Sequence, residues 1–85
     1  MQITLEIPQY DSGSGFEIKW ENGFEINTKV ENEEIIISAN KAGLVSLAKQ
    51  LLSLAQENVP SGYHFHFDEY NSLEEGSFEL IIKKV

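Results

Sequence analysis

The chain has 85 residues, with fourteen acidic and six basic side chains that give a formal net charge of −8 at pH 7. This length suits a single domain, residues 1–85. The acidity argues against a nucleic acid as the partner, and the absence of cysteine excludes both a disulfide framework and a thiolate metal site. We recognise no targeting or membrane-spanning segment, so we expect a cytoplasmic protein without a membrane partner.

The first predicted strand spans residues 2–7, where apolar and polar side chains alternate as in a half-buried strand before Pro8 ends it. Residues 10–15, with the sequence YDSGSG, are expected to form a flexible loop. This Gly/Ser segment has no lysine of the phosphate-loop type and does not lead into a helix, so it gives no indication of nucleotide binding.

Residues 16–20 and 24–30 also alternate, which predicts a hairpin. A two-residue Asn-Gly turn would place the apolar side chains of the two strands on different faces. We therefore expect a three-residue loop in which Gly23 adopts a left-handed conformation and Trp20 pairs with Phe24.

A further strand is predicted over residues 35–39, facing Val30 across the sequence ENEE. A two-residue turn would place Glu31 directly opposite Glu34, and like charges in that position are unfavourable. We therefore expect a four-residue loop that keeps Val30 against Ile35.

The stretch from Asn40 to Pro60 predicts the helix of the chain, with Asn40 as N-cap and a helical core over about residues 41–57. At 100° per residue the apolar side chains form one broad side, which we expect to pack on a sheet. That side contains Leu44, Leu47, Ala48, Leu51, Leu52, Leu54 and Ala55. Full burial would make Leu51→Ala cost roughly 2 to 5 kcal/mol.

Two more strands follow, over residues 63–68 and 78–85. Strands before and after a single helix predict an α+β fold, a single and largely antiparallel sheet of about six strands with the helix on one face. Aromatic side chains at Phe65 and Phe67 should join the core, which leaves His64 and His66 on the open face of the sheet.

The sequence HFHFD places His64, His66 and Asp68 on one side of a strand, where they could share a metal ion, with Glu69 as a further carboxylate. A small metal-binding domain or metal-dependent enzyme is therefore the alternative reading. No catalytic residue, cofactor or resident metal is assigned, because the chain has no cysteine, no G-x-S-x-G elbow and no carboxylate pair in an apolar setting.

The segments GLVSLAKQLLSLAQ and VPSGYHFHFDEYNSLEEGSFELIIKK resemble the bacterial immunity protein 32 family, over roughly Asn40 to Lys84. The resemblance implies a non-enzymatic protein of polymorphic toxin systems that binds and neutralises a cognate toxin. The acidic charge predicts that this toxin has a basic surface, as a nuclease would. We expect a monomer or weak homodimer, and a structural subunit or homodimer assembled through an unpaired strand edge is the third possibility. The expected partner-binding residues are His64, His66, Asp68, Glu69, Tyr70, Asn71, Glu74 and Glu75.

Overall fold

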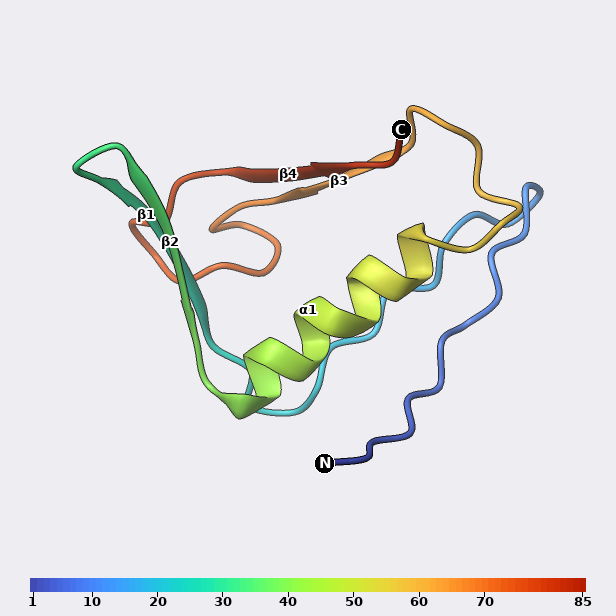
Figure 1. Ribbon diagram of the computed structural model, residues 1–85, viewed down its shortest axis with the longest axis horizontal. Helices are drawn as coiled ribbons and strands as arrows, with labels where there is room; N and C mark the ends of the chain where they lie inside the picture. Colours follow the sequence, from blue (N-terminus) through green and yellow to red (C-terminus); the bar gives the residue numbers. More distant parts are fainter.

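The computed structural model describes residues 1–85 and contains one helix and four strands. These are β1 (Ile26–Glu31), β2 (Glu34–Ala39), α1 (Lys41–Leu54), β3 (His64–Phe67) and β4 (Leu80–Lys83). The strands form two separate antiparallel pairs, β1 with β2 and β3 with β4, and the helix lies beside both (Figure 1). The predicted α+β class is confirmed, whereas the predicted single sheet of about six strands is wrong.

Two of the six predicted strands, residues 2–7 and 16–20, are missing, and both lie in the amino-terminal third of the chain. Residues 2–7 and 16–20 are extended but belong to no sheet, and only an isolated bridge joins Asp11 to Gly15. For residues 16–20 and the turn after them, the reason is that the backbone exchanges hydrogen bonds with the helix in place of a partner strand. Gln50 Nε2 donates to the Lys19 carbonyl at 2.7 Å, and the Glu21 amide donates to Ser46 Oγ at 2.7 Å.

The turn that follows keeps part of the predicted geometry. Gly23 has φ 76°, and the Phe24 amide donates to the Glu21 carbonyl at 3.2 Å. The Trp20 and Phe24 rings stack with centroids 4.8 Å apart. The left-handed glycine and the aromatic pair were therefore predicted correctly, although the two flanking segments do not form a hairpin ladder.

The helix begins as predicted, because Asn40 Oδ1 accepts from the Gly43 amide at 2.8 Å. It packs, however, on a different side from the one expected. The buried helix residues are Gly43, Ser46, Gln50, Ser53 and Leu54. The predicted apolar side is buried only in part, because Leu54 is buried and Leu47 packs against the core, whereas Leu51 and Leu52 are 47% and 49% exposed. The predicted cost for Leu51→Ala therefore falls to about 1 kcal/mol.

The helix packs on this side because its small and polar residues, Gly43, Ser46 and Gln50, lie there. Gly43 lies so close to the backbone of Glu25 that an added Cβ would collide with the Glu25 carbonyl oxygen. Ser46 and Gln50 supply hydrogen bonds that an apolar side chain could not give to the extended segment. A helix that must serve as the hydrogen-bonding neighbour of an unpaired segment buries its polar side.

The β1–β2 hairpin has the predicted Val30–Ile35 pair, but the predicted four-residue loop is wrong. Glu31 does pair with Glu34, and the turn has two residues, Asn32 and Glu33, at φ 51° and 64°. An ion pair between Lys29 Nζ and Glu31 at 2.8 Å offsets the repulsion between the two carboxylates.

The core consists of two small clusters joined by Phe65 and Ile82, which pack against both. One cluster contains Tyr10, Leu54 and Val59, and the other contains Ile26, Phe67 and Leu73. The predicted inward direction of Phe65 and Phe67 is confirmed. The core lies between the two strand pairs and the helix, so the far sides of both strand pairs are free to form surfaces.

Candidate partner-binding surface

The outer face of β3 carries the two histidines of the chain. Their side chains are exposed because they alternate with Phe65 and Phe67, which point to the core. The His64 and His66 ring centroids are 4.8 Å apart, and His66 Nδ1 lies 3.5 Å from a carboxylate oxygen of Glu79. The predicted position of both imidazoles on an open face is confirmed.

The loop after β3 is held by side chains that are among the predicted partner contacts. Asp68 Oδ1 accepts from the amides of Tyr70 at 2.9 Å and Asn71 at 3.1 Å. Asn71 Oδ1 accepts from the Asp68 amide at 3.1 Å, and Asn71 Nδ2 donates to the His66 carbonyl at 2.9 Å. Asp68 and Asn71 therefore shape this loop, whatever else they contact.

The second half of the loop is fastened at two points. Glu69 accepts from the Gly76 amide at 3.0 Å, which closes the loop across seven residues. The Glu74 amide donates to the Ile26 carbonyl at 2.8 Å, which ties the loop to β1, and Leu73 beside it is buried in the core. Residues 68–76 are thus held in one conformation on the molecule's surface, and we call this loop the platform.

Tyr70 stands at the tip of this platform with 90% of its side chain exposed. Its backbone amide donates to Asp68 Oδ1, while its ring packs against no other aromatic ring. Glu74 and Glu75 are exposed on the same loop and take part in no ion pair. The same loop therefore carries an exposed aromatic ring and two carboxylates that form no ion pair.

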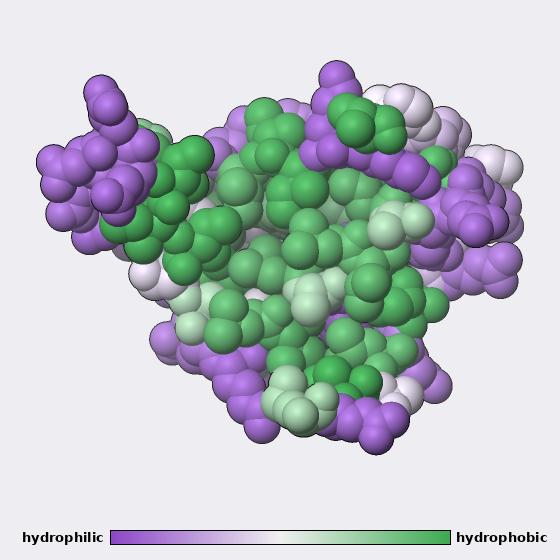
Figure 2. All heavy atoms as spheres, in the orientation of Figure 1, coloured by the Kyte–Doolittle hydropathy of each residue, from purple (hydrophilic) through white to green (hydrophobic).

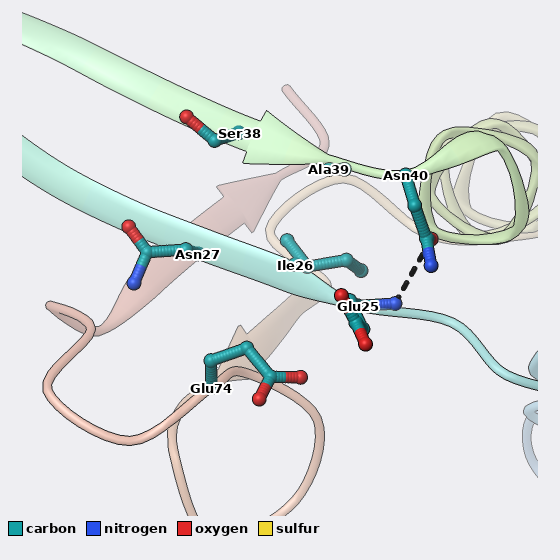
Figure 3. Close-up of a pocket in the computed structure, with 7 residues that line it drawn as sticks. All are labelled: Glu25, Ile26, Asn27, Ser38, Ala39, Asn40 and Glu74. Atoms are coloured by element: carbon teal, nitrogen blue, oxygen red, sulfur yellow. Dashed lines mark hydrogen bonds between the residues drawn. The ribbon is translucent and has the colours of Figure 1, made fainter.

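Glu74 also borders a hollow of about 310 Å³, shown in Figure 3. The hollow is lined by Glu25, Ile26, Asn27, Ser38, Ala39, Asn40 and Glu74. Glu25 and Glu74 bring two carboxylates to it, and Asn40 lies on the side opposite Glu74. This hollow is not predictable from local patterns, because the long-range hydrogen bond between the loop and β1 is what brings Glu74 to the same hollow as Glu25.

The predicted alternative metal site is not assembled. The structure contains no group of three His, Cys, Asp or Glu side chains that could hold a metal ion. One reason is visible at Asp68, whose Oδ1 faces two loop amides. Separately, no helix is long and apolar enough to span a membrane.

Fold and surface together define a small α+β protein that presents its polar and aromatic groups on an open platform. The chain belongs to the immunity protein 32 family, whose family model matches residues 34–85. This confirms the resemblance found in the sequence, and the matched region includes every predicted partner-binding residue. Searches among curated proteins and among solved structures found no match.

Proposed function

We propose that this chain binds a cognate bacterial toxin and neutralises it by direct protein contact, without catalysis of its own. Membership of an immunity protein family supports the role. The observation that carries the choice of surface is Tyr70, an almost fully exposed aromatic residue on a hydrogen-bonded loop that also carries the unpaired carboxylates of Glu74 and Glu75. The proposed contacts are His64, His66, Asp68, Glu69, Tyr70, Asn71, Glu74 and Glu75.

The geometry favours affinity because the loop is already ordered. Tyrosine is enriched among residues that dominate binding energy, since it buries a large rigid ring and still offers a hydroxyl. Binding also costs less when a contact loop needs no ordering. The bonds from Asp68, Glu69 and Asn71 supply that order, so these three act mainly by holding Tyr70 and the glutamates in place.

The charge of the chain defines the partner's chemistry. A net charge of −8 attracts a basic protein from a distance and accelerates their encounter. A toxin that cleaves nucleic acid fits this description, because it must itself attract phosphates. The hollow between Glu25 and Glu74 would accept one lysine or arginine side chain of such a toxin. The complex would form in the cytoplasm of the producing cell.

The direct test is co-expression with the toxin domain encoded next to this chain, followed by binding of the two purified proteins. We expect the wild-type chain to restore growth, and Tyr70→Ala to weaken binding about tenfold or more because a central aromatic contact is lost. Tyr70→Phe is the matched control and should bind within a few-fold of wild type. Failure of the wild-type chain to rescue growth or bind would refute the proposed function.

The electrostatic part has its own measurement. The association rate should fall steeply as sodium chloride is raised, and the double variant Glu74→Gln/Glu75→Gln should show a shallower dependence on salt. Glu57→Gln, an exposed acid outside the proposed surface, serves as the comparison. An association rate that is indifferent to salt in the wild-type chain would contradict steering by charge.

A further inference from the structure

Seven large apolar side chains in regular elements are between 43% and 75% exposed, which is unusual for a chain with so small a core. We call five of them the apolar face: Val30, Ile35 and Ile37 of the β1–β2 hairpin, and Leu44 and Leu51 of α1. The other two are Leu52, about 100° around the helix from Leu51, and Ile81, which lies opposite His66 in the β3–β4 pair. Figure 2 shows a broad hydrophobic surface that extends from below the hydrophilic hairpin tip across the middle of the molecule.

Register places the three hairpin residues of the apolar face on one face of the β1–β2 pair. Val30 lies opposite Ile35, and Ile37 is two residues further along β2, on the face that carries Ala39. Ala39 contacts the start of the helix, because a Cβ on Gly43 would approach it within 3.0 Å. The hairpin face that packs on the helix near Gly43 therefore continues outward as the exposed isoleucines.

On the helix, Leu44 and Leu51 are seven residues apart and so share one side. Leu51 also lines a shallow hollow of about 160 Å³, together with Leu54, Ala55, Ile82 and Lys84. This hollow joins the helix to β4. The apolar face thus offers a recess that an apolar side chain of another protein would fill.

The size of the exposed surface agrees with a missing neighbour. The chain exposes 6124 Å², about 1,000 Å² more than the roughly 5,100 Å² expected of a compact monomer of 9.6 kDa. The radius of gyration is 13.5 Å, against about 12 Å for a compact domain of this length. One partner contributes about 800 Å² to a stable protein interface, and the excess, which is summed over the whole chain, is of that size.

We propose that the apolar face is a second docking surface for the toxin, and that it receives an apolar patch flanked by lysine or arginine. This inference rests on the proposed function. The flanking charge follows from the hairpin tip, where Glu33 and Glu34 adjoin Ile35 and have no ion-pair partner, while Glu31 pairs with Lys29. A second copy of the chain fits poorly, because it would bring together two molecules of charge −8.

The test compares two leucines of equal exposure on the same helix. Leu51→Gln removes an apolar contact of the face without changing the charge, and Leu52→Gln makes the same change about 100° further around the helix. Affinity for the co-expressed toxin domain is measured by calorimetry, and stability by urea denaturation. We expect Leu51→Gln to weaken binding at least tenfold and Leu52→Gln to leave it within twofold, with both variants folded.

Each result has one reading. If both variants bound the toxin domain as tightly as the wild-type chain, the apolar face would not be a docking surface, and the proposed function would stand. No binding by the wild-type chain would overturn both. Sedimentation at several concentrations should show a monomer, and a dimer that Leu51→Gln dissociates would assign the face to a second copy and overturn the toxin as its occupant.

Discussion

Alanine at position 43 is expected to destabilise the fold by about 2 kcal/mol or more, although alanine is a better helix former than glycine. The added Cβ would collide with the Glu25 carbonyl oxygen and press on Ala39 and Ile26, both 3.0 Å away. A backbone carbonyl cannot rotate away as a flexible side chain can. The helix would have to move from the β1–β2 hairpin, and the buried Ile26 would lose its packing.

Urea denaturation of Gly43→Ala measures this cost. Gly13→Ala is the matched control, since a Cβ there meets only an Asp11 oxygen at an ordinary 3.5 Å and φ lies outside the left-handed region. We expect the control to change the free energy of unfolding by less than about 0.5 kcal/mol. A Gly43→Ala protein as stable as wild type, or more so, would show that the helix does not approach the hairpin this closely.

Glutamate at position 50 should be far more harmful than glutamate at position 51. Gln50 is 2% exposed, and its Nε2 donates to the Lys19 carbonyl at 2.7 Å. Gln50→Glu keeps the shape but directs a buried carboxylate oxygen at that carbonyl, which should cost about 3 kcal/mol. Leu51 is half exposed, so Leu51→Glu loses about 1 kcal/mol of apolar burial.

Both variants are compared at pH 7 by urea denaturation, and the order of their stabilities is the readout. If the helix instead buried Leu51 and exposed Gln50, the order would be reversed, and Leu51→Glu would be the less stable variant. That reversed order would refute the packing of the helix described here, and with it the exposure of the apolar face.

Local patterns predicted the features that depend on neighbouring residues. The helix start at Asn40, the Val30–Ile35 pair and the inward direction of Phe65 and Phe67 follow from capping, alternation and strand spacing. Which side of the helix is buried could not be found this way. Apolar periodicity favours the leucines, whereas the outcome depends on an extended segment about thirty residues away that needs hydrogen bonds from Ser46 and Gln50.

On the candidate surface, too, local features were predictable from the sequence and long-range ones were not. The exposed histidines were predictable from period-two alternation, and Tyr70 was named from its motif. The internal bonds of Asp68, Glu69 and Asn71 were not foreseen, because residues of these types suit a hydrated contact surface and a structured turn equally well. The acidic hollow required the contact between Glu74 and Ile26, which are distant in the sequence.

The like-charged tip of the β1–β2 hairpin has a consequence for the freshly synthesised protein. Strand β2 pairs only with β1, so its other edge is open, and it carries three consecutive isoleucines. An exposed, apolar strand edge of this kind is a template for aggregation. Glu33 and Glu34 at the turn into β2 repel a second copy that approaches this edge, and so keep single molecules dispersed.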